Sequence, residues 1–199
     1  MVAIETRDVG TYRMVRFSSG RIDPVATDVD LLIVGMPEIS GAMQADPSGC
    51  ALDDALIGTL SHLRAGGIFD GGFGETLVLS SPRPPVRCGS LLVVGMGHTD
   101  RITPERLGIL AEVAMRAAVQ LDGCSIACLL GLPDPEAPVA VASHAARNMM
   151  VGALTAIDTH HAPQRFAGMR WTFDLRTPYS ANVGAQLEHV IDQWPTVRR

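Results

Sequence analysis

LDDALIGTLSHLRAGGIFDGGFGETLVL at residues 52–79 and LLVVGMGHTDRITPERLGILAEVAMRAAVQL at residues 91–121 decide the fold of this chain. Their patterns occur in the order helix, glycine-rich loop, strand, strand, glycine turn and helix. Strands that alternate with helices in this way are typical of a sheet covered by helices. The stretch therefore predicts an α/β domain.

The first helix of this stretch is indicated by leucines at helical spacing, Leu52, Leu56, Leu60 and Leu63. Asp53 and Asp54 would lie in its first turn, where the helix dipole favours negative charge. Gly66 and Gly67 would end it, because glycine accepts the left-handed conformation of a helix cap. We expect one continuous helix.

Two strands follow, at 75–80 (ETLVLS) and 90–95 (SLLVVG). The proline-rich connection between them, 81–89, is too short for a helical crossover, so the pair is expected to be antiparallel. Thr103 with Pro104 then predicts the start of a second helix. Its buried stripe is expected to comprise Leu107, Leu110, Ala111, Ala114, Ala118 and Leu121.

The flanking segments extend the same α/β pattern. We expect strands at 11–17 (near an edge), 29–35, 125–130 and 170–175, a loop at 37–49, and helices at 136–158 and 182–194. The helix at 136–158 would bury Ala146, Met150, Ala153 and Ile157, and Gly152 would let it approach a neighbour closely. These elements predict a three-layer α/β/α fold with a mixed, mostly parallel sheet.

One domain is expected over residues 1–199, with a core at about 11–158 and a C-terminal extension at 159–199. The aromatic residues of that extension are Trp171, Phe173 and Trp194. Two interpretations of them stand open: they close the core, or they form a contact between subunits.

Composition excludes several functions. Hydrophobic residues make up 47% and charged residues 19% of the chain, which argues against disorder. The net charge is −5 and no basic cluster is present, so we expect no nucleic-acid partner. All 16 basic residues are arginine, which excludes chemistry that needs a lysine, such as a Schiff base.

The cellular setting is predicted from absent patterns. The four cysteines form no CxxC pair, which favours buried free thiols in a reducing compartment. No signal segment opens the chain, and no apolar run approaches the ~20 residues that span a bilayer. We expect a soluble, cytoplasmic protein without a membrane partner.

Four segments in order resemble one known family. They are LDDALIGTL (52–60), GET (74–76), LLVVGMG (91–97) and TPERL (103–107). This set is similar to the N-terminal domain of the leucine aminopeptidase (cytosol aminopeptidase) family over about 28–122, and more loosely to about 158. The resemblance implies a macro-domain-like fold.

The same resemblance implies that catalysis lies elsewhere. In that family a C-terminal domain holds two metal ions with lysine, aspartate and glutamate residues, and the N-terminal domain contributes to assembly. About forty residues follow position 158, too few for such a domain. We therefore expect a stand-alone, non-catalytic relative without a cofactor, acting as an assembly or binding module with copies of itself or a partner protein.

One candidate ligand site emerges at two glycine-rich turns. The first is the glycine loop, residues 70–74, and the second is the strand-end turn, residues 95–100. Backbone amides at such turns bind phosphate, and macro domains hold a phosphate group in a glycine-rich loop, so a nucleotide or ADP-ribose-type ligand is one interpretation. The other, which we favour, is that the glycines satisfy backbone geometry alone. The candidate residues are Gly71, Gly72, Gly74, Gly95, Gly97, His98 and Thr99.

Three weaker patterns remain. Asp158 with His160 and His161 suggests a metal site, but a solvated helix end explains these residues better. Ser143 and His144 lack the GxSxG elbow of a hydrolase. Cys88 is a nucleophile only if its thiolate is stabilised. We expect no catalytic residue and no metal at these positions.

Overall fold

A computed structural model describes residues 6–38, 47–132, 134, 136–175 and 180–194. Its sheet has seven strands in the order β1-β2-β7-β6-β3-β5-β4. The strands are β1 (Thr6–Tyr12), β2 (Val15–Gly20), β3 (Leu31–Pro37), β4 (Thr76–Ser80), β5 (Ser90–Gly97), β6 (Ser125–Leu129) and β7 (Arg170–Asp174). The helices are α1 (Pro47–Ala55), α2 (Thr59–Ala65), α3 (Pro104–Gln120), α4 (Val139–Thr159) and α5 (Ser180–Gln193), with short 3-10 turns η1 (Thr99–Arg101) and η2 (Pro163–Phe166).

The sheet is mixed and mostly parallel, as the sequence predicts. The pairs β2/β7, β7/β6, β6/β3 and β3/β5 are parallel, whereas the outer strands β1 and β4 each run antiparallel to their neighbour. The antiparallel β4/β5 pair confirms that the short connection at 81–89 makes no crossover.

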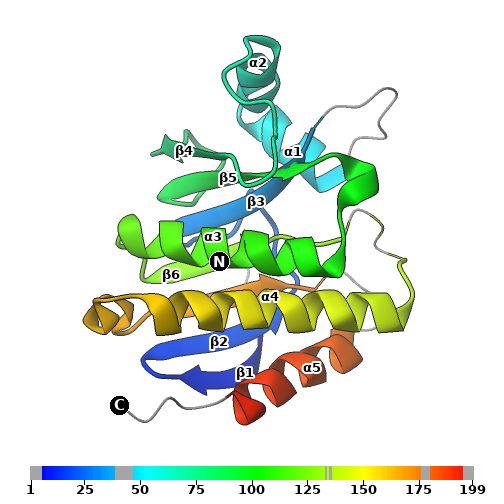
Figure 1. The fold of residues 1–199 in the computed structure, drawn as a ribbon. Coiled ribbons are helices and arrows are strands. Elements are labelled where there is room, and N and C mark those ends of the chain that lie inside the picture. The colour runs from blue at the N-terminus through cyan, green and yellow to red at the C-terminus, as the bar shows by residue number, and fades with distance from the viewer. Residues whose placement is uncertain (1–5, 39–46, 133, 135, 176–179, 195–199) are drawn as a thin grey trace.

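Helices cover both faces of the sheet (Figure 1). On one face, α3, α4 and α5 bury a large core with Phe17, Trp171 and Phe173. On the other face, α1 and α2 bury Leu52 and Leu60 against the β3 and β5 half of the sheet. These layers confirm the α/β/α fold, although the helices of the second face cover only part of it.

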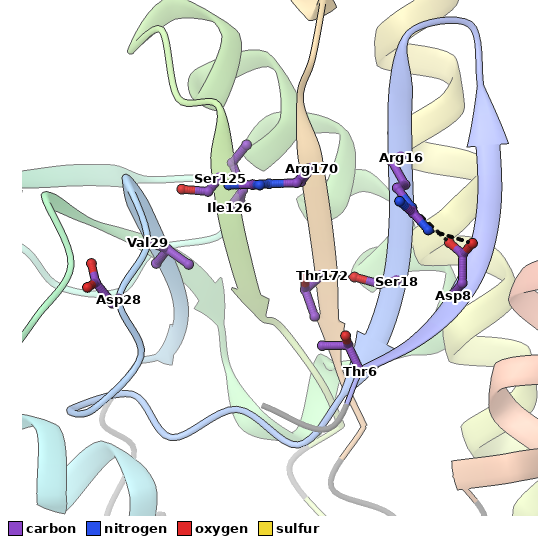
Figure 2. Close-up of a pocket in the computed structure, with 10 residues that line it drawn as sticks. All are labelled: Thr6, Asp8, Arg16, Ser18, Asp28, Val29, Ser125, Ile126, Arg170 and Thr172. Atoms are coloured by element: carbon purple, nitrogen blue, oxygen red, sulfur yellow. Dashed lines mark hydrogen bonds and ion pairs between the residues drawn. The ribbon is translucent and has the colours of Figure 1, made fainter. Parts of the chain in front are cut away.

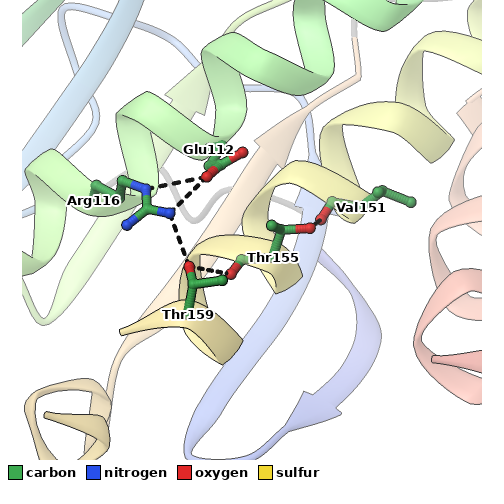
Figure 3. A network of polar contacts seen from close by, with 5 residues as sticks. All are labelled: Glu112, Arg116, Val151, Thr155 and Thr159. Carbon is green, nitrogen blue, oxygen red and sulfur yellow. Dashed lines mark hydrogen bonds and ion pairs between the residues drawn. The ribbon is translucent and has the colours of Figure 1, made fainter. Parts of the chain in front are cut away.

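The contact between α3 and α4 also has a polar rim (Figure 3). The guanidinium of Arg116 donates to Glu112 Oε1 at 2.7 Å and to Thr159 Oγ1 at 2.8 Å, and so links the end of α4 to the middle of α3. The expected start of α3 is confirmed, because Thr103 Oγ1 accepts a hydrogen bond from Arg106 N. Leu121 departs from the predicted stripe: it follows the last turn of α3 and is 40% exposed.

The predicted continuous helix over the leucines is wrong. The chain instead forms α1 and α2, separated by Leu56, Ile57 and Gly58. Of these, Ile57 and Gly58 adopt left-handed backbone conformations (φ 57° and 72°). Asp53 lies inside α1 rather than in its first turn, and its carboxylate accepts from Leu60 N at 2.8 Å. One acidic side chain thereby satisfies a free amide at the start of the next helix.

The predicted strand at 11–17 is instead a tight hairpin. β1 ends at Tyr12 and β2 begins at Val15, with Arg13 in the left-handed region (φ 49°) between them. Such two-residue turns need positive φ, which matches the twist of the two strands. Arginine is not typical at that position, so the sequence did not indicate a turn there.

The C-terminal aromatic residues close the core. β7 lies between β2 and β6 in the interior of the sheet, and Trp171 and Phe173 are fully buried. Trp194, just after α5, donates from its indole Nε1 to Asp158 Oδ2 at 2.8 Å. Of the predicted loop at 37–49, residues 39–46 lie outside the described residues, and α1 has begun by Pro47.

Candidate functional site

The glycine loop lies directly on the end of β5. Gly74 N donates to Gly95 O at 2.9 Å, and Gly97 N donates to Gly71 O at 2.9 Å. Glu38 N, just after β3, donates to Gly97 O at 3.0 Å. The structure therefore brings the two predicted turns together at the carboxyl ends of parallel strands, where α/β sheets usually bind ligands.

The contact between the two turns leaves no room for side chains. A Cβ atom at Gly95 would lie 2.0 Å from Gly72 O, and one at Gly71 would lie 2.8 Å from Pro37 O. Gly71 also has a φ of 82°, a conformation that favours glycine. Backbone packs against backbone here, which is a structural reason for these two glycines.

The amides of the glycine loop already hold an anion. Glu75 Oε2 accepts hydrogen bonds from Gly71 N and Gly72 N, both at 3.0 Å. Adjacent backbone amides that point at one oxygen form the kind of nest that binds phosphate in other proteins. In this chain the nest is filled by the chain's own carboxylate. Sequence reasoning missed this role of Glu75, although its position three residues after Gly72 was a usable signal.

A side chain of α3 also contacts the glycine loop. The guanidinium of Arg106 lies over the ring of Phe73, 3.7 Å from its centroid, which is a cation–π contact. Gly97 has a φ of 71°, and a Cβ there would lie 3.2 Å from the Arg106 guanidinium. No pattern in the sequence pointed to Arg106, because only the fold places α3 over the loop.

His98 and Thr99 continue the strand-end turn. His98 precedes η1, and Thr99 begins it. The His98 ring lies 4.0 Å from Asp100 and is nearly half exposed. All seven predicted residues therefore lie in one continuous region, with His98 and Thr99 on its rim.

A hollow of about 410 Å³ lies on the part of the sheet that α1 and α2 leave uncovered (Figure 2). Arg16 pairs with Asp8 at 3.0 Å, and the hydroxyls of Ser18 and Thr172 lie 2.8 Å apart. Hydrogen bonding to Arg16 lowers the pKa of Asp8. The lining residues are Thr6, Asp8, Arg16, Ser18, Asp28, Val29, Ser125, Ile126, Arg170 and Thr172. Two arginines and two aspartates balance, so the hollow does not favour an ion of either sign.

Asp158, near the end of α4, is the centre of a group of polar contacts that we call the clasp. Asp158 accepts from Tyr12 Oη at 2.8 Å and Trp194 Nε1 at 2.8 Å, and pairs with Arg13 at 2.7 Å. His160 Nδ1 accepts from Ala162 N, and its ring stacks on His161. Within the described part of the chain, no group of three metal-ligating side chains has the arrangement of a metal site.

The remaining candidates lack nucleophile chemistry. Burial raises the pKa of the Cys88 thiol to about 11, so it is protonated at neutral pH. His144 lies 3.6 Å from Glu105 across the α3–α4 contact, and both side chains are more than half exposed.

Comparisons with known proteins agree on family and fold. The cytosol aminopeptidase family, N-terminal domain, matches residues 33–158. A point mutant of tomato leucine aminopeptidase is similar at 22% identity and a TM-score of 0.60, over 88% of this chain and 36% of the tomato chain. This chain thus spans about a third of that enzyme's length. No curated protein sequence matches it significantly.

Macrodomains share the fold at lower identity. A point mutant of the Oceanobacillus iheyensis macrodomain aligns over 96% of this chain and 100% of its own, with a TM-score of 0.63 and 12% identity. A Trypanosoma brucei macrodomain in complex with ADP aligns over 88% of this chain and 69% of its own, with a TM-score of 0.56 and 13% identity. In the described residues, none of the helices is both long enough and apolar enough to span a membrane.

Proposed function

Because this chain belongs to the cytosol aminopeptidase family through that family's N-terminal domain, we propose that it acts as a non-catalytic assembly or binding module. The observation that carries the proposal is the filled amide nest: Glu75 occupies the amides of Gly71 and Gly72 that would otherwise receive a ligand anion. The glycines that resemble a ligand-binding loop in the sequence are thus occupied by hydrogen bonds within the loop and with β5.

Three further features are consistent with the non-catalytic part of the proposal. The sequence contains no lysine, the described residues hold no metal-ligating group of three, and the two buried thiols Cys88 and Cys128 have raised pKa values. Those unpaired buried thiols also fit a reducing, cytoplasmic location.

Two measurements on the purified protein test this function. Sedimentation velocity over a wide concentration range should show a reversible self-associated species. A leucyl chromogenic substrate with Mn²⁺ or Zn²⁺ should show no turnover above the buffer rate. Turnover that scales with protein and stops on chelation would overturn the non-catalytic part, and a monomer at every concentration would overturn self-assembly.

A second candidate function is binding of a nucleotide or ADP-ribose-type molecule at the glycine loop and the strand-end turn. It is favoured by one observation: Gly71, Gly72, Gly74, Gly95, Gly97, His98 and Thr99 converge at the carboxyl ends of β3 and β5. The Trypanosoma brucei macrodomain, which has a similar fold, is in complex with ADP.

Calorimetric titration with ADP and ADP-ribose tests this candidate. Gly72→Leu is the matched variant, because a Cβ there meets nothing closer than 3.6 Å and the fold should tolerate it. Binding by the wild type that Gly72→Leu abolishes, with an unchanged circular dichroism spectrum, is the expected result. Undetectable binding by the wild type, or equal binding by both proteins, would overturn the assignment.

A further inference from the structure

The two edges of the sheet are protected very differently. The β1 edge carries charged Arg7 and Asp8, has a bulge between Asp8 and Gly10, and packs against α5. Charges, bulges and covering helices are devices that stop a sheet edge from pairing with another chain. In the described residues, the β4 edge at the other end of the sheet carries no charge and no bulge, and no helix makes an extensive contact with it.

β4 is short, neutral and apolar in its centre. Its sequence is Thr76-Leu77-Val78-Leu79-Ser80, without a charge or a proline. Its neighbour in the sheet is β5, and no other described strand lies beyond it (Figure 1). The carboxylate of the preceding Glu75 is turned away into the glycine loop, so it does not guard the edge.

The register with β5 shows which backbone groups face outward. Gly95 N donates to Glu75 O at 2.7 Å, and Ser81 N donates to Gly89 O at 2.9 Å. Hydrogen-bonded pairs alternate along an antiparallel ladder, so Leu77 and Leu79 also bond to β5. The amides and carbonyls of Thr76, Val78 and Ser80 therefore point away from the sheet, and no described residue bonds to them.

The outward groups are self-complementary. TLVLS is nearly symmetric about Val78, with a leucine on each side and a hydroxyl residue beyond each leucine. A twofold axis at Val78 would pair Val78 with its own copy and Thr76 with Ser80 of the partner strand. All three outward-facing residues would then form hydrogen-bonded pairs, giving roughly six hydrogen bonds because each pair exchanges two. Isologous contacts of this kind define a C2 dimer.

Exposed apolar side chains occur on the strand itself, in the loop before it and on α3. Val78 is 38% exposed, Phe73 is 37% exposed and Ile109 of α3 is 50% exposed. Standard interfaces bury about 800 Å² per partner, more than a five-residue strand supplies, so these side chains would contribute the remainder. Strand β4 carries no charged residue, so pairing two copies along it brings no like-charged side chains of the strand together.

We propose that β4 is a self-association edge, at which two copies of this chain pair antiparallel about Val78 and extend the sheet across the dimer. This inference rests on the proposed assembly function and names the surface that would perform it. It differs from the glycine loop, because it uses backbone groups that the fold leaves unpaired.

The test compares two lysine variants at equally exposed valines. Val78→Lys places two like charges at the twofold axis and should raise the dimer dissociation constant by about tenfold or more. Val141→Lys is the control, since Val141 is also 38% exposed but lies on α4. Sedimentation velocity should show weakened association for Val78→Lys alone, with unchanged thermal unfolding of the monomer.

A mixing experiment makes the test specific to the axis. Val78→Lys and Val78→Glu should each be mainly monomeric, and an equimolar mixture should recover a dimer because opposite charges then meet. A wild-type oligomer that Val78→Lys leaves intact would overturn the β4 edge while the assembly function stands. A wild type that is monomeric at every concentration would overturn both.

Discussion

Gly108 of α3 and Gly152 of α4 meet backbone to backbone. A Cβ atom at Gly152 would lie only 1.9 Å from Gly108 O, and a Cβ at Gly108 would lie 2.8 Å from Asn148 O. The largest core of the molecule is built under these two helices, so their separation is set by residues without side chains. The sequence pattern predicted a close approach at Gly152, and the structure confirms it.

The first prediction follows from that contact. Gly152→Ala should lower the free energy of unfolding by about 2 kcal/mol, since overpacking of this kind outweighs the gain in helix propensity. Gly184→Ala on α5 is the control, because its Cβ would meet only atoms at 3.7 Å or beyond. Urea denaturation should show a loss for Gly152→Ala and none for Gly184→Ala. Equal stability of both variants would contradict the close contact.

The second prediction concerns the filled nest of the glycine loop. Glu75→Ala leaves the amides of Gly71 and Gly72 without their acceptor and should cost about 1–3 kcal/mol of stability. Glu75→Gln keeps an oxygen acceptor and should cost less. Inorganic phosphate should raise the melting temperature of Glu75→Ala more than that of the wild type, because the vacated amides favour an anion. The same phosphate response in both proteins would argue against the nest.

The third prediction tests the clasp around Asp158. Asp158→Ala removes the acceptor of Tyr12 Oη and Trp194 Nε1 and the partner of Arg13, and should cost about 2–3 kcal/mol. Asp158→Asn retains an acceptor oxygen and should lose less. Both variants should shift the tryptophan emission to longer wavelength if α5 loosens, because Trp194 becomes more exposed while Trp171 stays buried in the core. A spectrum identical to that of the wild type would mean that the clasp does not hold α5.

Local signals in the sequence predicted part of this fold well. The Thr103-Pro104 start and the buried stripe identify α3 because capping and periodicity act within a few residues. The break between α1 and α2 was missed, because Ile57 is not a residue that usually adopts a left-handed conformation. The position of a strand in the sheet, such as that of β7 between β2 and β6, is set by long-range packing that no local pattern encodes.

The candidate site shows the same division. The glycines could be found from the sequence because several of them lie within a few residues of one another, which is an unusual local pattern. The partner that fills their amides, Glu75, and the guanidinium of Arg106 over Phe73 depend on how the loop folds back and where α3 lies. A glycine-rich loop therefore indicates a tight backbone arrangement before it indicates a ligand.

The last prediction uses the buried thiols. Burial raises the pKa of Cys88 to about 11 and that of Cys128 to about 12, from a usual value of 9.0. The folded chain therefore binds more protons than the unfolded chain between about pH 9 and pH 12, and its stability should fall as pH rises through that window. Replacing both cysteines with alanine should flatten this dependence in urea titrations at a series of pH values.

At pH 8, iodoacetamide should modify the exposed Cys124 and spare Cys88 and Cys128 until urea unfolds the chain. Rapid labelling of Cys128 in the folded protein, read by peptide mass spectrometry, would show that this part of the core opens.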